Sequence, residues 1–516
     1  MTADSLHVHN ARIWTGDPQR PWARTISINA GRISSIDQPA SNASASINAE
    51  ARTIVPGLID SHLHLLTAGA TLTRLDLSSV RSRTEFERAI AQRHAELPPG
   101  QWLIANGWSQ ENWSGGAAPD KSWLSVAQDR PIVCYRMDMH VALVNDAVLK
   151  MCDLKSDPPG GRIVRDQPTG LPTGLMIEAA AWELVNPLVP KPSLPERQEH
   201  LRAAQRHVHA LGITTVGSME YARDVQDLYL PLRDELTLRC RITLLDRDWP
   251  MDFSFGRSIA NDCHFAIIGY KAFIDGTLGS RTARMLRDYA DDPGNRGMLV
   301  ELARDGRLHD WARAVAANGF SPSMHAIGDE AARLALDVID GIDSERRPRI
   351  EHAQQLDLAD IPRFRGRIAS MQPLHKADDC RYVQKRLGSE RLAGTFAFRT
   401  LADAGAILAF GSDWPVVSPD PLLGIRTAVT GLLVDGTRFG EQENLTVEEA
   451  LRAYTGGAAY ALGMDDAGIL RPGALGDLVM FDRDPFEADW EQQPPRVAMT
   501  IVGGNVVYDV TASQRA

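Results

Sequence analysis

The segment of the sequence with the clearest chemical meaning is Asp60-Ser61-His62-Leu63-His64, which follows the apolar run 53–59. Residues i and i+2 of a β-strand point to the same side, so a strand that ends here projects two imidazoles together. Neutral imidazole is the commonest metal ligand among side chains, and it binds zinc readily. The spacing therefore predicts that His62 and His64 form half of a metal site.

Four later apolar runs carry further side chains that can bind a metal or act as a base, namely Lys271, His325, His352 and Asp413. Lys271 lies inside the run 267–273, where a charged ammonium is costly, so we expect its pKa to be lowered. A neutral amine could take up carbon dioxide as a carbamate and bridge two metal ions. The residues alone leave an alternative open, in which Lys271 reaches the strand's end to meet water or pairs with Asp275.

An alternation of strand and helix patterns through the middle of the chain predicts how these side chains meet. Helical periodicity runs through 195–211, 302–317 and 330–339. Eight strands can be counted. The first ends at 64, and the other seven span 212–219, 238–246, 265–274, 321–325, 349–352, 367–372 and 406–412. This pattern predicts an α/β fold with a (β/α)₈ TIM-like barrel, whose active site lies at the carboxyl ends of the strands.

Short strands at both ends of the chain predict a second, smaller domain. They cover 6–14, 23–29 and 32–36, with a hairpin turn at Asn29-Ala30-Gly31, and then 477–481, 497–501 and 506–508. We expect residues 1–56 and 465–516 to pair into a composite β-sandwich and residues 57–464 to form the barrel. The stretch of about 70–193 is too long for a simple connection and predicts an inserted subdomain after the first strand, over the barrel mouth.

Bulk composition narrows the class of protein. The chain has 516 residues, 44% hydrophobic and 23% charged, which is ordinary for a globular protein. A net charge of −11 disfavours a nucleic-acid partner, and no apolar run approaches the roughly 20 residues of a membrane span. Five scattered cysteines and the lack of a signal-peptide pattern indicate a cytoplasmic protein.

The motifs around these residues resemble the amidohydrolase superfamily, specifically its amidohydrolase-3 (YtcJ-like) branch, which includes N-substituted formamide deformylases. The resemblance extends from Leu6 to Tyr508 and is carried by the segments 56–64, 271–283, 324–329, 351–352 and 411–415. One small departure is Gly476, which stands where the branch usually has alanine before Asp-Leu-Val.

The resemblance implies a set of metal ligands: His62, His64, Lys271, His325, His352 and Asp413. It implies two zinc ions bridged by carboxylated Lys271, with His62, His64 and Asp413 on one ion and His325 and His352 on the other. Mononuclear members of the superfamily leave the number of ions open. The family also implies a homodimer.

These ligands predict a metal-dependent hydrolase. A metal lowers the pKa of a bound water, and Asp413 is the best candidate for the general base. We expect cleavage of a linear C–N bond of the amide or N-substituted formamide type in a small-molecule substrate. The alternative is a cyclic amidase or heterocycle deaminase on the same scaffold, and lyase chemistry or a silent relative are further alternatives.

Five residues are candidates for contacting the substrate: Trp108, His140, Arg281, Gln372 and Trp414. Each has an alternative structural interpretation: for His140 it is a hydrogen-bonded residue of the insert, and for Arg281 it is a pair with Asp275. His375 is a further pocket candidate, and Glu178 either reaches the metals or caps a helix. Two other His-x-His pairs are not expected to bind metal: 7 and 9 lie in a sandwich strand, and 207 and 209 diverge on a helix.

Overall fold

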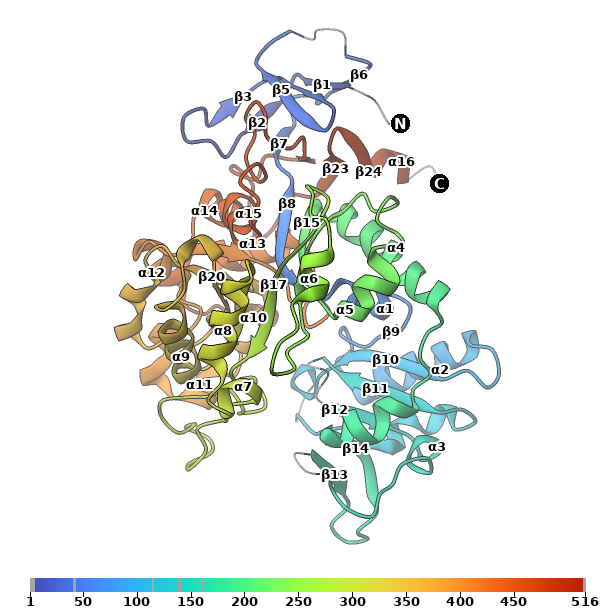
Figure 1. Ribbon diagram of the computed structural model, residues 1–516. Helices are drawn as coiled ribbons and strands as arrows, with labels where there is room; N and C mark the ends of the chain where they lie inside the picture. Colours follow the sequence, from blue (N-terminus) through green and yellow to red (C-terminus); the bar gives the residue numbers. More distant parts are fainter. Residues whose placement is uncertain are drawn as a thin grey trace. The chain divides into compact units, whose positions relative to one another are not determined.

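The computed structural model of the chain describes residues 5–39, 43–113, 116–137, 139, 141–158 and 161–513 (Figure 1). It divides into two compact units. The first comprises residues 1–65, 205–414 and 418–516, and the second comprises residues 66–204 and 415–417. We describe each unit by itself.

An eight-stranded parallel sheet in the order β21-β20-β19-β18-β17-β16-β15-β8 forms the barrel of the first unit. Its strands are largely buried, and β17 and β21 appear in the sequence as apolar runs, whereas β18 and β19 also carry buried polar side chains. They are β8 (Leu58–Leu63), β15 (Ile213–Glu220), β16 (Arg239–Leu244), β17 (Phe265–Phe273), β18 (Ser321–Ala326), β19 (Arg349–His352), β20 (Ile368–Met371) and β21 (Ile407–Phe410). All eight coincide with predicted strands, so the predicted fold class is confirmed.

The two edge strands of this sheet meet through one carboxylate. Asp60 on β8 accepts hydrogen bonds from the backbone N–H and the hydroxyl of Ser412, which follows β21, at 3.0 and 2.6 Å. The backbone N–H of Asp413 also donates to the carbonyl of His62 at 2.7 Å. These bonds hold the first and last strands together at their carboxyl ends.

Helices surround the barrel between and after its strands (Figure 1). They are α4 (Leu194–Ala210), α5 (Ala222–Asp224), α6 (Ser254–Ser258), α7 (Glu301–Arg304), α8 (Leu308–Ala317), α9 (Asp329–Ile339), α10 (Pro373–Asp379), α11 (Val383–Leu387), α12 (Phe398–Asp403), α13 (Pro421–Thr430), α14 (Val447–Ala453) and α15 (Gly456–Ala461). The single helix predicted over 302–317 is wrong. The chain breaks there between α7 and α8, because Gly306 adopts a φ of +69° that no helix continues through.

Strands from both ends of the chain build the β-sandwich. One sheet has the order β5-β4-β1-β6, and the other, β24-β23-β22-β7-β2-β3, pairs β22 of the C-terminal part with β7 of the N-terminal part. The strands are β1 (Ser5–His9), β2 (Arg12–Trp14), β3 (Trp22–Ala23), β4 (Ile26–Asn29), β5 (Arg32–Ile36), β6 (Ala45–Asn48), β7 (Thr53–Pro56), β22 (Leu478–Phe481), β23 (Val497–Val502) and β24 (Asn505–Asp509), followed by α16 (Val510–Ser513).

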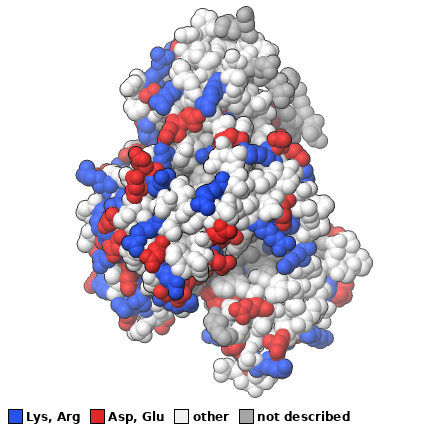
Figure 2. Space-filling model, in the orientation of Figure 1, with Lys and Arg blue, Asp and Glu red and all other residues white. Residues whose placement is uncertain are grey.

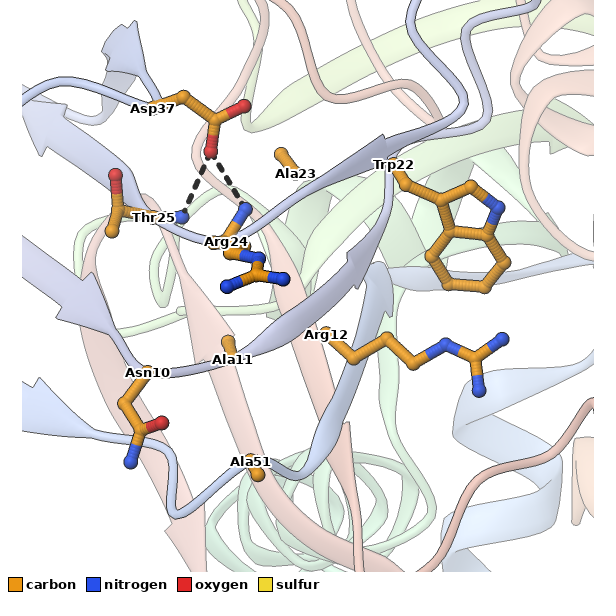
Figure 3. A pocket seen from close by; sticks show the side chains of 9 residues that line it. All are labelled: Asn10, Ala11, Arg12, Trp22, Ala23, Arg24, Thr25, Asp37 and Ala51. Atoms are coloured by element: carbon orange, nitrogen blue, oxygen red, sulfur yellow. Dashed lines mark hydrogen bonds between the residues drawn. The ribbon is translucent and has the colours of Figure 1, made fainter.

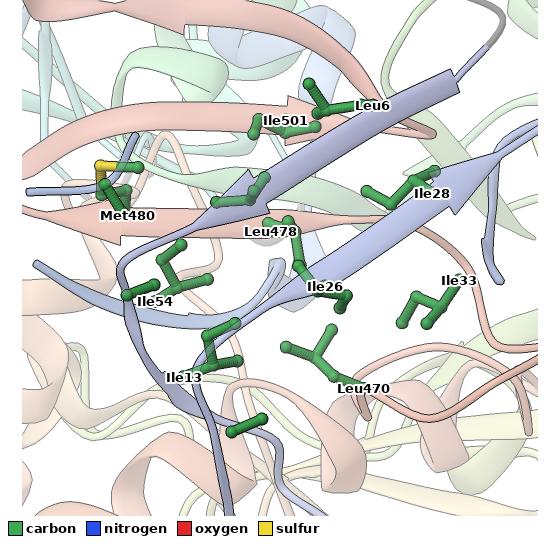
Figure 4. Packing of buried hydrophobic residues seen from close by; sticks show 14 of the residues in the cluster. Leu6, Ile13, Ile26, Ile28, Ile33, Ile54, Leu470, Leu478, Met480 and Ile501 are labelled. Carbon is green, nitrogen blue, oxygen red and sulfur yellow. The ribbon is translucent and has the colours of Figure 1, made fainter. Parts of the chain in front are cut away.

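Local residue choice explains the hairpins of the sandwich. Asn29 pairs with Arg32, which leaves Ala30 and Gly31 as a two-residue loop with φ of +46° and +77°. Positive φ at both loop positions matches the twist of the strands, and this confirms the predicted turn. The strand predicted over 6–14 is instead two strands, because Asn10 turns the chain with a φ of +52°. Aliphatic side chains from both sheets fill the core (Figure 4).

The sandwich joins the amino end of the barrel through a buried ion pair. Arg239 at the start of β16 donates from Nε and Nη2 to the two carboxylate oxygens of Asp477, at 2.7 and 2.9 Å. Gly503 donates its backbone N–H to the same carboxylate at 2.8 Å. Gly476 lies beside this pair, and a Cβ there would be 2.6 Å from Cγ2 of Ile28. This close approach explains why glycine replaces the alanine expected at 476.

The surface of the first unit is polar and mixed in charge. Lys and Arg lie among Asp and Glu across the face in Figure 2, as in the ion pairs of Arg363 with Asp337 and Asp340, both at 2.7 Å. A groove on the sandwich lies between Trp22, Arg24 and Asp37, and there the Asp37 carboxylate accepts the backbone N–H of Arg24 at 2.7 Å (Figure 3). The groove belongs to the sandwich rather than to the carboxyl ends of the barrel strands.

The second unit has its own mixed sheet in the order β13-β14-β12-β11-β10-β9. Its elements are α1 (Leu65–Thr71), β9 (Leu75–Asp76), α2 (Arg83–Glu96), β10 (Leu103–Trp108), β11 (Ile132–Arg136), β12 (Val141–Val144), α3 (Asp146–Leu149), β13 (Gly161–Arg165), β14 (Pro172–Glu178) and a π-helix (Ala180–Val185). The domain boundaries predicted from the sequence, 1–56 with 465–516 and 57–464, stay predictions. The position of the insert over the barrel mouth also stays a prediction. Among the described residues, no helix has the length and apolar character needed to cross a membrane.

Candidate metal centre

The carboxyl ends of five barrel strands carry the six predicted ligands. His62 lies on β8 and His64 directly after it, while Lys271, His325 and His352 lie on β17, β18 and β19. Asp413 follows β21. Parallel pairing places these positions at similar heights, since Phe273 pairs with His325 and Ala326 pairs with His352. The fold therefore brings together side chains that are up to 351 positions apart, from His62 to Asp413.

Three of these side chains form a compact group of donor atoms. One ligand atom each from His62, His352 and Asp413 lies within 4.8 Å of the others, and all three residues are buried. Nε2 of His62 and Nε2 of His64 lie 3.4 and 3.3 Å from the same oxygen of Asp413. The rings of His325 and His352 are 4.4 Å apart between centroids. The six residues thus form one contiguous cluster of nitrogen and oxygen donors.

Hydrogen bonds to the outer ring nitrogens fix which nitrogen of each histidine faces the centre. Nδ1 of His62 bonds Glu351 at 2.7 Å, and Nδ1 of His352 bonds the Gln372 side-chain oxygen at 2.8 Å. Both acceptors require the proton on Nδ1, which leaves Nε2 as a lone-pair donor. His325 is reversed, because its Nε2 lies 3.0 Å from the carbonyl of Gly276. His325 therefore offers Nδ1.

A buried carboxylate supports His62 from inside the barrel. Glu351 also contacts Nε of Arg349 at 3.0 Å and accepts the hydroxyl of Ser323. Burial alone would raise the pKa of the Glu351 carboxyl, but Arg349 and His62 outweigh burial and hold that pKa well below its ordinary value. Sequence reasoning assigned no role to Arg349 or Glu351. Their signal was the pair of opposite charges at i and i+2 within a buried strand, which places both on the interior face.

Lys271 is 1% exposed, and its Nζ lies 3.4 Å from Nε2 of His62. Burial lowers the pKa of Lys271 to about 8, while the nearby Glu351 and Asp413 oppose that shift. Asp275 is not its partner, because the Asp275 carboxylate accepts the backbone N–H groups of Arg284, Ile327 and Gly328 at 2.8 to 3.1 Å. The amine of Lys271 thus faces the cluster of metal-ligand atoms and does not form an ion pair with Asp275.

Asp413 is held in an unusual backbone conformation, with φ of +60°. Burial alone would raise the pKa of its carboxyl, but the neighbouring His62 and His64 hold that pKa well below the ordinary range. The carboxylate is therefore ionised at neutral pH. Its second oxygen, Oδ2, faces Nε2 of His375 at 3.8 Å.

The candidate substrate residues fall into three groups. Gln372 and Trp414 lie beside the cluster: Gln372 bonds His352, and the carbonyl of Trp414 accepts the backbone N–H of His64 at 2.9 Å. The Trp414 ring lies 5.2 Å from that of His207. Trp108 is 1% exposed in the core of the second unit and donates its indole N–H to the carbonyl of Cys134, which favours a packing role. His140 lies outside the described residues.

Arg281 forms the third group, and the predicted alternative, a pair with Asp275, is wrong. It donates from Nε and Nη2 to Asp291 at 3.0 and 2.8 Å rather than to Asp275. Asp291 also accepts Nη1 of Arg386 at 2.5 Å. Sequence spacing did not reveal this, because residues 276–300 fold as an irregular loop whose contacts are not periodic.

The remaining histidine pairs and Glu178 have separate positions. His209 bonds the carbonyl of Ile213 at 2.9 Å and the hydroxyl of Thr237 at 3.0 Å. His7 bonds the hydroxyl of Ser27 at 2.9 Å within the sandwich. Glu178 ends β14 in the second unit with a φ of +53°.

Comparison with known proteins identifies the family. The model of the amidohydrolase family Amidohydro_3 matches residues 45–508. The chain belongs to the amidohydrolase family. It is 35% identical to Protein LONG AFTER FAR-RED 3 of Arabidopsis thaliana, over 98% of this chain and 92% of that one. It is 32% identical to YtcJ of Bacillus subtilis, over 90% of each chain.

Two further likenesses bear on the chemistry. An N-substituted formamide deformylase of Arthrobacter pascens is 25% identical over 98% of this amidohydrolase and 99% of its own length. The crystal structure of an uncharacterised metal-dependent hydrolase from Pyrococcus horikoshii OT3 superposes with a TM-score of 0.77 and 25% identity, covering 95% of this chain and 99% of that one. The protein is therefore a metal-dependent hydrolase of the amidohydrolase family, in the predicted branch.

Proposed function

We propose that this amidohydrolase cleaves a linear C–N bond, of the amide or N-substituted formamide type, with water at the cluster around His62, His352 and Asp413. The observation that carries the proposal is the convergence of their donor atoms within 4.8 Å of one another. They lie at the carboxyl end of the barrel, which is where barrel enzymes place their chemistry. The likeness to a formamide deformylase over nearly the full length of both chains supports this class of substrate.

We propose that this donor set holds two zinc ions. Imidazole nitrogens and a carboxylate oxygen are ligands that zinc prefers, and the hydrogen bonds at Nδ1 of His62 and His352 leave Nε2 of each free to bind. We propose that His62, His64 and Asp413 hold one ion and that His325 and His352 hold the other. Lys271, carried as a carbamate, would bridge them. Its burial and lowered pKa support this role, because only the neutral amine reacts with carbon dioxide.

Asp413 is the proposed general base. A divalent ion held by these residues would lower the pKa of a water molecule and polarise a carbonyl group. The ionised carboxylate of Asp413 accepts a proton from the attacking water and returns it to the leaving nitrogen. The C–O bond forms first, and the C–N bond breaks as the nitrogen takes up the proton. The products are a carboxylate, formate in the case of a formamide, and a protonated amine.

Glu351 and Gln372 keep the histidines in the binding tautomer. Each accepts the Nδ1 proton of one ligand, so that the ring can neither flip nor present the wrong nitrogen. Arg349 in turn keeps Glu351 ionised. We propose these three as positioning residues for the centre.

A substrate panel tests the proposal. Purified enzyme supplied with zinc would be assayed with an N-alkylformamide, an anilide, a hydantoin and an aminopyrimidine, with amine or ammonia release as the readout. We expect turnover of the formamide or the anilide, and its loss in His352→Ala. Selective turnover of the hydantoin or the aminopyrimidine would replace the proposal with the cyclic amidase or deaminase alternative.

We also propose a cytoplasmic homodimer, as the sequence and the family indicate. Light scattering after size-exclusion chromatography tests the dimer. A mass near twice the 56.6 kDa of the chain is expected, and a mass of one chain would contradict it.

A further inference from the structure

His375 is a buried histidine of the barrel mouth that has no place in the predicted ligand set. It lies in the first turn of α10, directly after β20, and its backbone N–H donates to the carbonyl of Gln372 at 3.0 Å. The side chain is 9% exposed. Its ring is nearly parallel to that of His352, with 5.8 Å between centroids and 9° between planes. The backbone and the packing thus hold the imidazole in one orientation.

The nitrogen of His375 that faces the cluster has no hydrogen-bond partner. Nε2 is buried, and among the described residues nothing bonds it. Leaving a buried polar group unpaired is unfavourable, so such a group marks a place where a ligand or a function can supply the partner. The other histidines around it are paired: His62 and His352 through Nδ1, and His325 through Nε2.

Asp413 is the nearest charged group, but it does not satisfy this nitrogen. Oδ2 of Asp413 is 3.8 Å from Nε2 of His375, which exceeds hydrogen-bond length. The other oxygen of Asp413 is already approached by His62 and His64. Nε2 of His375 therefore lies beside the proposed base, on the side of Oδ2, while His62 and His64 approach Oδ1.

We propose that His375 is a catalytic residue whose Nε2–H donates a hydrogen bond to the carbonyl oxygen of the substrate. This inference rests on the proposed function. In the attack of water on an amide, that oxygen is the atom that gains negative charge, and a fixed donor stabilises it more in the transition state than in the ground state. The leaving nitrogen needs a proton instead, and Asp413 supplies it. No proton is transferred from His375 in this step.

The matched variants are His375→Phe and His375→Gln. Phenylalanine keeps a flat ring against His352 but cannot donate, whereas the amide of glutamine can donate from a position close to that of Nε2. His309→Phe is the control, because His309 is exposed on α8. Each would be made in the full chain and checked for zinc content by mass spectrometry and for melting temperature.

The kinetic result expected for His375→Phe is a fall of about 10²–10³-fold in kcat, the usual effect of removing one such donor, with KM changed by less than about threefold. His375→Gln recovers about tenfold or more of that loss. Zinc content stays at the wild-type level in both variants. A loss of zinc together with activity would make His375 a metal ligand, and a kcat within threefold of wild type would remove it from catalysis; either result overturns the inference.

A binding measurement separates this inference from the proposed function. Methylphosphonate, a tetrahedral oxyanion, would be titrated calorimetrically into the zinc-loaded wild type and into each variant. We expect its Kd to rise at least tenfold in His375→Phe and much less in His375→Gln. If no substrate of the panel is turned over but this loss of affinity appears, the proposed substrate class fails and the role of His375 stands. Unchanged phosphonate affinity in a variant that has lost activity would show that His375 acts through Asp413, which also overturns it.

Discussion

The two ends of the same barrel bury charge in opposite ways. At the amino end, Arg239 places two nitrogens on the two oxygens of Asp477, and a backbone N–H completes the group. At the carboxyl end, lone pairs of His62, His352 and Asp413 converge within 4.8 Å, and Nζ of Lys271 lies 3.4 Å from Nε2 of His62. Buried charge that is satisfied internally holds the sandwich to the barrel. Buried lone-pair atoms that lack a full set of partners within the chain provide a binding site, and their burial lowers stability.

The same contrast appears in the pKa values of buried histidines. Burial lowers the pKa of His209, in the helix that leads into the amino end of β15, to about 4, and both of its nitrogens are bonded. Burial and the nearby Lys271 lower the pKa of His325, in the cluster, to about 3. Both rings stay neutral at pH 7, but only the ring in the cluster has a nitrogen to offer an ion.

The largest effect should come from removing the base at the carboxyl end. Asp413→Asn keeps the shape of the side chain but cannot accept the proton of water. We expect kcat on the substrate identified by the panel to fall about 10³–10⁴-fold, the upper range for a general base. Retention of a tenth of the activity would remove Asp413 from this role.

Breaking the ion pair at the amino end should instead affect stability. Asp477→Ala leaves the Arg239 guanidinium buried without its carboxylate, and loss of one partner of such a pair costs about 3–5 kcal/mol. We expect that loss in urea unfolding, with kcat of the folded enzyme unchanged. Asp466→Ala is the control, since its pair with Arg32 at 2.8 Å is exposed and should contribute less than about 1 kcal/mol. Equal effects of the two variants would contradict the contrast.

His209, the hydrogen-bonded histidine of α4, should make the stability of the fold depend on pH. The pKa of His209 is about 4 in the folded chain and about 6.5 in the unfolded chain, so the unfolded state takes up the proton first as the pH falls. Its contribution is therefore fully present above about pH 6.5 and is lost between about pH 6.5 and 4, by up to about 3 kcal/mol. The unfolding free energy of His209→Gln, measured across this pH range, should fall less steeply than that of the wild type. An identical slope in both proteins would contradict it.

The smallest effect concerns the support of the ligands. Glu351→Gln weakens the hydrogen bond at Nδ1 of His62, and loss of such a partner usually lowers metal affinity about 10–100-fold. Zinc affinity measured by competition with a chelator should fall within that range. Glu443→Gln is the control, because Glu443 is a buried glutamate that bonds the hydroxyl and backbone of Thr400 instead. If zinc affinity is unaffected by Glu351→Gln, the carboxylate does not orient His62.

Much of this arrangement could be predicted from the sequence, for a physical reason. Barrel strands are largely buried, so strands such as β17 and β21 are apolar runs, and polar residues such as His325 and Asp413 mark the strand ends. The turn at Ala30-Gly31 was predictable because a two-residue hairpin loop demands positive φ. The break at Gly306 was missed because the apolar period continues across it and only the backbone angle changes.

The surroundings of the cluster were less predictable. The pairing of Arg281 with Asp291, and the bonds that Gln372 and Glu351 make to ligand rings, depend on where loops and strand ends meet in space. His375 had no periodic or motif-based signal beyond its place after β20. Its significance depends on an unpaired nitrogen, which only the assembled site reveals.

Metal content per chain tests whether Lys271 bridges a centre of two zinc ions. Protein purified without chelators would be analysed as wild type, as Lys271→Met and as Lys376→Met; Lys376 is a second buried lysine, which donates to the carbonyl of Gly440 at 3.4 Å. We expect about two zinc ions per chain in the wild type and in Lys376→Met, and one or none in Lys271→Met. One ion in all three proteins would contradict a centre bridged by Lys271.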